Sequence, residues 1–147
     1  MLKRYRLGFD LWGLVLFLAT MIPTFVWLAV AAPDDVLCAK SVTPAVDAIG
    51  FVLQVLFVAM VCFVVRKDTV RETSFMLSAI VCVALYFVGW VLYYIGMTGA
   101  RVILLLSLPP CLAFVFYAIG RRNLLAIVPA VGFTVCHMIY AFVNFII

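Results

Sequence analysis

Five uncharged, apolar runs separated by short charged segments make up most of this chain. They cover residues 11–33, 48–65, 73–100, 102–120 and 123–147. Each reaches or exceeds the roughly 18 residues at which an apolar stretch becomes a candidate transmembrane helix, because the hydrocarbon core is about 30 Å thick and a helix rises about 1.5 Å per residue. The runs therefore predict an all-α, polytopic membrane bundle of five transmembrane helices.

The composition excludes an ordinary soluble globule. The chain is 69% hydrophobic and 11% charged, whereas a soluble domain is about 45–50% apolar and about 25% charged. The longest connection, residues 33–43, is too short to fold alone. We therefore expect one transmembrane domain over residues 1–147, with helices at about residues 9–31, 44–65, 70–95, 102–120 and 124–146.

Two of the predicted helices begin with recognisable capping signals. Thr43 precedes Pro44, and proline is well suited to the first position of a helix because its missing N–H has no partner there. The segment from Thr69 to Glu72 has the spacing of a capping box. It places the start of the third helix near residue 70, inside the most highly charged stretch of the chain, Arg66–Glu72.

The positive charges predict how the bundle is oriented. Eight of the ten basic residues fall on one of its faces: Lys3, Arg4, Arg6, Arg66, Lys67, Arg71, Arg121 and Arg122. Because basic residues are retained on the inner side of a membrane, we expect a cytoplasmic N-terminus, an external C-terminus and a multi-pass protein of the bacterial cytoplasmic membrane. The basic residues lack interleaved aromatic side chains, which argues against nucleic acid as a partner.

Three prolines inside the predicted helices predict kinks. Pro23, Pro109 and Pro110 lack the N–H that would bond the carbonyl four residues earlier. We interpret the kinks as features that shape helix packing. The alternative is ion coordination by the freed carbonyls, as in transporters with interrupted helices.

Small and polar residues predict which helix faces point inward, because helices in a bilayer associate through such residues. The stripes are Ala130, Thr134, His137, Ala141 and Asn144 on the fifth helix; Ser78, Cys82, Tyr86, Gly89, Tyr93 and Gly96 on the third; and Asp47, Gly50 and Gln54 on the second. We expect the three stripes to face one another. If the second and fifth helices are neighbours, Asp47 and Asn144 form one polar layer, and Gln54 and His137 form another about 10 Å deeper.

His137 is the only histidine and the strongest candidate for a functional residue, because an ionisable group within a membrane span is a functional-site hypothesis by default. Its chemistry suits proton relay or ligand binding. The structural alternative is a neutral imidazole that bonds Gln54 or a tyrosine and only holds helices together.

Two acidic residues at the starts of predicted helices have structural explanations as well. Asp47 is a candidate partner for His137 or a cation ligand in an external vestibule, but it also lies in the first turn of a helix, where the dipole favours an acid. Asp10 begins the first helix, and we expect it to reach water. The candidate polar cluster is therefore His137, Gln54, Asp47, Asn144, Thr134 and Tyr93.

Recognisable catalytic and metal-binding motifs are missing from the sequence. The five cysteines form no C-x-x-C pair, so zinc and dithiol chemistry lack their usual spacing. Only Cys38 falls in a predicted external loop, where it could join two protomers. No phosphate-binding loop, H-E-x-x-H or G-x-S-x-G motif appears. We expect no catalytic residues, metal or cofactor.

The sequence therefore favours a non-enzymatic membrane protein that acts as an accessory or packing subunit, or that forms a homo-oligomer. Its expected partners are the lipid bilayer and either itself or another membrane protein. A second hypothesis is a small solute or ion transporter or channel, with an externally open vestibule around His137. A third, an intramembrane enzyme using His137 with Tyr93 or Asp47 as acid and base, lacks an identifiable nucleophile or metal.

Overall fold

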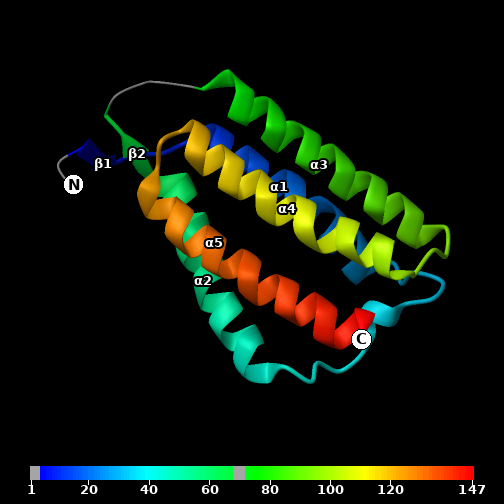
Figure 1. Cartoon of the computed structure of the whole chain (residues 1–147). Helices are drawn as coiled ribbons and strands as arrows, with labels where there is room; N and C mark the ends of the chain where they lie inside the picture. The colour runs from blue at the N-terminus through cyan, green and yellow to red at the C-terminus, as the bar shows by residue number, and fades with distance from the viewer. Residues whose placement is uncertain (1–3, 68–71) are drawn as a thin grey trace.

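The computed structural model describes residues 4–67 and 72–147, which form five long helices and a short β-ribbon (Figure 1). The helices are α1 (Leu11–Ala29), α2 (Pro44–Phe63), α3 (Thr73–Tyr94), α4 (Ala100–Gly120) and α5 (Leu124–Ala141). A π-helical turn, Phe142–Ile146, extends α5. Each helix is long and apolar enough to cross a membrane. The predicted helical architecture with five candidate spans is therefore confirmed.

The β-ribbon was not predicted. Strand β1 (Tyr5–Leu7) pairs antiparallel with β2 (Val64–Arg66), and Arg6 lies opposite Val65. The second helix was expected to continue to residue 65, but it ends at Phe63 because the β-branched pair Val64–Val65 extends and bonds to β1. The predicted capping box at Thr69 lies outside the described residues, and α3 is assigned from Thr73.

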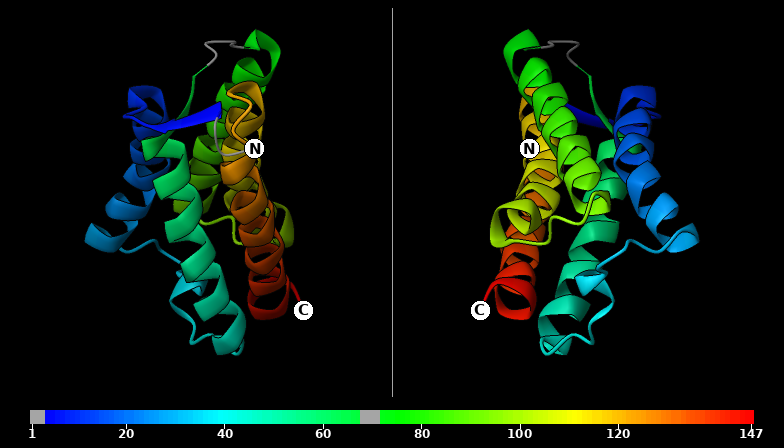
Figure 2. Two further views of the ribbon diagram at one scale, coloured as in Figure 1. Left: turned by 90° about the vertical axis from the view of Figure 1, so that its left-hand side faces the viewer. Right: turned by 90° about the vertical axis from the view of Figure 1, so that its right-hand side faces the viewer.

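The helices pack as two long antiparallel pairs. α3 lies along α4, α2 lies along α5, and α4 also contacts α5, which joins the pairs. The inner stripe of the third helix therefore packs mainly against α4, rather than against α2 and α5 as predicted. α1 makes fewer contacts, which are shared among α2, α3 and α4. Figure 2 shows α1 close to α2 at one end of the bundle and diverging from it toward the other.

The two ends of the bundle differ in chemistry. We call the end with β1, β2 and the α4–α5 turn the basic end, because Arg66, Lys67, Arg121 and Arg122 lie there. The opposite end, with the α1–α2 connection (residues 30–43) and the α3–α4 turn, is the loop end. The described chain begins at the basic end and finishes at the loop end (Figure 1).

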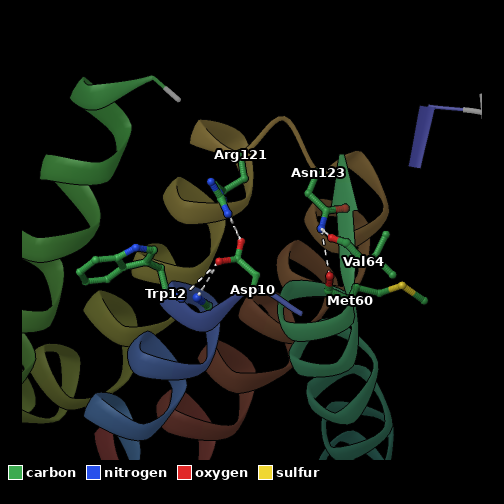
Figure 3. Close-up of polar contacts among 7 residues, drawn as sticks. Asp10, Trp12, Met60, Val64, Arg121 and Asn123 are labelled. Atoms are coloured by element: carbon green, nitrogen blue, oxygen red, sulfur yellow. Dashed lines mark hydrogen bonds and ion pairs between the residues drawn. The ribbon is translucent and has the colours of Figure 1, made fainter. Parts of the chain in front are cut away.

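Asp10 and Arg121 form the central contact of the basic end (Figure 3). Arg121 Nε donates to Asp10 Oδ2 at 2.8 Å, and a second guanidinium nitrogen pairs with the same oxygen. Asp10 Oδ1 accepts from the amides of Trp12 and Gly13 and so caps α1. The prediction that Asp10 reaches water was wrong: the α4–α5 turn covers it, and it is 6% exposed.

Asn123 links the start of α5 to the end of α2. Its Oδ1 accepts from the Ala126 amide, which caps α5, and its Nδ2 donates to the carbonyls of Met60 and Val64 at 3.0 and 2.9 Å (Figure 3). Nearby, Arg122 Nε donates to Glu72 Oε1 at 3.0 Å, but this pair is largely exposed. These contacts connect the basic ends of all five helices.

The prolines do not interrupt the helices that contain them. α1 continues past Pro23, and α4 continues through Pro109 and Pro110. The hydroxyl of Thr20 donates to the carbonyls of Leu16 and Phe17. The kinks themselves stay a prediction.

Candidate functional site

A cavity of about 440 Å³ lies between the helices, and all five contribute to its wall. α2 and α5 supply most of its polar groups, α4 supplies Pro110, Cys111 and Phe114, and α1 supplies Thr20 and Thr24. Most of the lining surface is apolar. A cavity of this size, apolar with a few polar groups, has the character of a small-molecule site.

Three residues of the predicted polar cluster line this cavity, and three do not. Asp47, Gln54 and His137 face it together, because α2 and α5 are neighbours. Thr134 lies outside the lining, and its hydroxyl donates to the Ala130 carbonyl of its own helix at 2.8 Å. Asn144 and Tyr93 bond elsewhere at the loop end.

His137 presents its imidazole to the cavity without a protein hydrogen-bond partner among residues 4–67 and 72–147. Its ring lies between Phe133 and Tyr140, with centroid distances of 5.2 and 6.0 Å and interplanar angles of 19° and 22°. Gln54 likewise bonds no described residue. The structural alternative, in which His137 bonds Gln54 or a tyrosine, therefore finds no such bond among the described residues.

Because Gln54 and His137 make no hydrogen bonds to the described protein, their polar groups need partners inside the cavity. Burying an amide or imidazole in an apolar medium without a hydrogen bond costs roughly 2–7 kcal/mol. In a bilayer, only protein, water or a ligand can supply that bond. Gln54 and His137 have no partner in the described protein, so their polar atoms are available to whatever occupies the cavity.

Asp47 lies where the cavity approaches the loop end. Thr43, the N-cap residue of α2, donates its hydroxyl to Asp47 Oδ1 at 3.0 Å. Asn144 Nδ2 donates to the same hydroxyl oxygen at 2.9 Å. Asp47 and Asn144 are thus joined through Thr43, and the second carboxylate oxygen of Asp47 bonds no described residue.

Aromatic side chains form the deeper wall of the cavity. Phe57 packs against Phe114 and Phe133, with ring centroids 4.8 and 5.2 Å apart. Near the middle of the wall, the hydroxyls of Thr24 and Tyr86 lie 3.4 Å apart and connect α1 with α3. The cavity is therefore most polar near Asp47 and most apolar around Phe57.

Sequence reasoning missed a second polar cluster, which is centred on Asp35 at the loop end. Asp35 accepts hydrogen bonds from Trp27 Nε1 at 2.9 Å, Tyr93 OH at 2.8 Å and Cys38 Sγ at 3.2 Å. The Leu37 amide donates to Tyr93 OH. The cluster ties α1 and the α1–α2 connection to α3. No sequence spacing marks it.

Hydrogen bonds set the charge state of this second cluster. Partial burial raises the pKa of Asp35, but the bonds from Tyr93, Cys38 and Trp27 outweigh that effect and leave the pKa below its ordinary value. The bond to Asp35 raises the pKa of the Cys38 thiol, as do partial desolvation and the negative charge nearby. Cys38 is therefore held as a thiol.

The chain matches no protein family, no curated protein and no solved structure. Within residues 4–67 and 72–147, no three His, Cys, Asp or Glu side chains cluster as metal ligands would. Its chemistry must therefore be inferred from the cavity and its residues.

Proposed function

We propose that this chain is a small multi-pass protein of the bacterial cytoplasmic membrane that binds a small molecule in the cavity between its helices. This is the binding part of the transporter hypothesis drawn from the sequence. The observation that carries it is the pair of unpartnered polar side chains, Gln54 and His137, that face one cavity.

The volume of the cavity and its extension to the outer surface of α2 support the binding of a small molecule. Its volume of about 440 Å³ lies within the range of about 300–1,000 Å³ typical of ligand pockets. Phe51 lines the cavity and is also 66% exposed, so the cavity extends to the outer surface of α2. Phe51 lies seven residues into α2, about 10 Å along the helix. In a bilayer, this edge would meet lipid, and a molecule dissolved in the membrane would enter there.

The proposed orientation follows from the charges. The basic end would face the cytoplasm, because basic residues are retained on that side. The loop end, with Asp35 and Asp47, would face outward. The cavity would then be polar toward the outside and apolar toward the cytoplasm.

Two native cysteines provide a test of whether small molecules reach the cavity. Cys136 lines it, whereas Cys82 is buried and lies outside the lining. In a variant that retains only Cys136, reconstituted in lipid nanodiscs, methyl methanethiosulfonate should label the thiol rapidly, as measured by intact mass. A matched variant that retains only Cys82 should react much more slowly. Equal, slow labelling of both thiols would contradict the proposal.

The accessory-subunit and homo-oligomer roles favoured by the sequence stay predictions, as does the absence of enzymatic activity. Purification in native lipids, combined with the labelling of Cys136, distinguishes these roles from ligand binding. A defined oligomer or a co-purifying membrane protein, together with an unreactive Cys136, would favour a packing role. A monomer whose Cys136 reacts would favour the binding role.

A further inference from the structure

We infer that the cavity selects an organic cation: a molecule with one positive amine or ammonium group on an apolar, aromatic-sized body. The inference rests on the proposed binding function and adds the chemical class of the ligand. Three observations carry it: Asp47 is the one charged side chain among the described residues of the cavity wall, aromatic rings surround the apolar part of the cavity, and the two features are separated along α2.

The charge of the wall favours a cation. Among residues 4–67 and 72–147, Asp47 is the only acidic residue that lines the cavity, and no lysine or arginine lines it. In the part of the chain that the structure describes, the only polar side chain bonded to the Asp47 carboxylate is the Thr43 hydroxyl, which is neutral. Since Coulomb interactions strengthen several-fold when water is displaced, a carboxylate without a basic neighbour attracts a positive ligand and repels an anion.

The aromatic rings favour an organic cation over an inorganic one. Phe57, Phe114, Phe133 and Tyr140 line the cavity, and the first three form a continuous cluster. These rings would bury the apolar body of such a ligand. A small metal ion has no apolar body to bury and would need several oxygen ligands, whereas Asp47 is the only carboxylate among the described residues that line the cavity.

The order of these groups along α2 matches an amphipathic ligand. Asp47 lies near the start of α2 and Phe57 ten residues later, about 15 Å along the helix. Gln54 and His137 lie between them. A cation bound at Asp47 would thus extend its apolar body toward Phe57, with a polar substituent able to bond Gln54 or His137 on the way.

The test uses two probes that differ by one methyl group and one charge: 1-methyl-4-phenylpyridinium and its parent 4-phenylpyridine, which is uncharged at mildly alkaline pH. Each is titrated against the rate at which methyl methanethiosulfonate labels the variant that retains only Cys136. We expect the cation to slow labelling by half at a concentration about tenfold lower than the neutral parent.

Two further variants test the role of Asp47. Asp47→Asn keeps an oxygen that accepts the Thr43 hydroxyl but removes the charge, and it should abolish the preference for the cation. Asp34→Asn removes an exposed charge outside the cavity wall and should keep the preference. Gel filtration and the unprotected labelling rate show that each variant is folded.

The outcomes separate this inference from the proposed function. A preference that Asp47→Asn removes and Asp34→Asn keeps supports the inference. Equal protection by both probes overturns the organic-cation class while leaving the binding function supported. A preference that survives Asp47→Asn also overturns the inference, because the charge responsible would lie elsewhere. An unreactive Cys136 in the absence of probe overturns both.

Discussion

Side-chain hydrogen bonds at the basic end connect all five helices, whereas those at the loop end form two separate groups. At the basic end, Asp10 pairs with Arg121, Glu72 with Arg122, and Asn123 with the end of α2. α1, α2, α3 and the α4–α5 turn are therefore held together by contacts between neighbouring segments.

One loop-end group joins α1 to α3 through Asp35, and the other joins α2 to α5 through Thr43 and Asn144. Among residues 4–67 and 72–147, no side-chain hydrogen bond connects the two groups. They are linked by the α1–α2 connection itself, near Ala39 and Lys40.

The loop end is therefore the part of the molecule where a change of shape needs the fewest contacts to break. Local opening starts where few interactions must break together. At the basic end, several bonds and a buried ion pair would have to break together. At the loop end, the two groups can separate without breaking a side-chain bond, and the cavity lies between the helices that they hold.

The largest expected effect is the loss of the buried ion pair. Arg121→Ala leaves Asp10 buried and without its partner, and we expect this to lower the free energy of unfolding by about 3–5 kcal/mol. Equilibrium unfolding in mixed detergent micelles measures the change. Arg122→Ala is the matched control, because its pair with Glu72 is exposed and worth about 0–1 kcal/mol. Similar losses for the two variants would show that the basic end is not held by Asp10.

Substitutions at two glycines, Gly13 and Gly50, test how closely α2 packs against its neighbours toward the two ends of the bundle. A Cβ at Gly13 would lie 2.7 Å from the Val61 carbonyl oxygen, whereas one at Gly50 would lie 3.5 Å from Cys136 Cβ. We expect Gly13→Ala to destabilise the protein by about 1–3 kcal/mol, because the α1 and α2 backbones must separate.

Gly50→Ala serves as the control and should be neutral or stabilising by about 0.5–1 kcal/mol, because alanine favours the helix. Thermal unfolding midpoints of the two variants provide the measurement. A Gly13→Ala protein as stable as the parent would mean that α1 is not closely packed at the basic end.

Asn123 at the basic end and Asn144 at the loop end each form three side-chain hydrogen bonds, so replacing each by alanine compares the stability of the two ends directly. Asn123→Ala removes a helix cap and two bonds to α2, and should cost about 2 kcal/mol. Asn144→Ala removes bonds to Val42, Thr43 and Tyr140, and should cost about 0.6 kcal/mol, the average for polar contacts between membrane helices. The same micelle unfolding assay ranks them, and the reverse order would contradict the proposed difference between the ends.

The smallest effect is a pH dependence confined to the loop end. The folded pKa of Asp35 lies below its unfolded value of about 3.9. Its carboxylate therefore stabilises the folded state above about pH 4, and this contribution, below about 1 kcal/mol for a partly exposed site, is lost as the pH falls through the folded pKa.

Trp27 reports this titration, because its indole bonds Asp35. In a variant with Trp12 and Trp90 replaced by phenylalanine, its emission should change in acid, and Asp35→Asn should remove the change. A transition that persists in Asp35→Asn would assign it to another group.

Helix number, type and approximate limits were predictable because hydrophobic length and charge are local properties of the chain. The shared position of Asp47, Gln54 and His137 followed from their spacing once α2 and α5 were neighbours. The partners of Asp10 and Asp35 were not predictable, because Arg121 and Tyr93 are distant in sequence and no periodicity marks such pairs. The β-ribbon was missed since three-residue strands carry too little pattern to compete with a predicted helix end.

The 111 residues that separate Asp10 from Arg121 also have a consequence for biogenesis. Asp10 emerges from the ribosome well before Arg121, which emerges only after α4. During the intervening translation, the start of α1 has no ion-pair partner from the α4–α5 turn. In a membrane, α1 would thus be inserted well before the contact that fixes its place in the bundle can form.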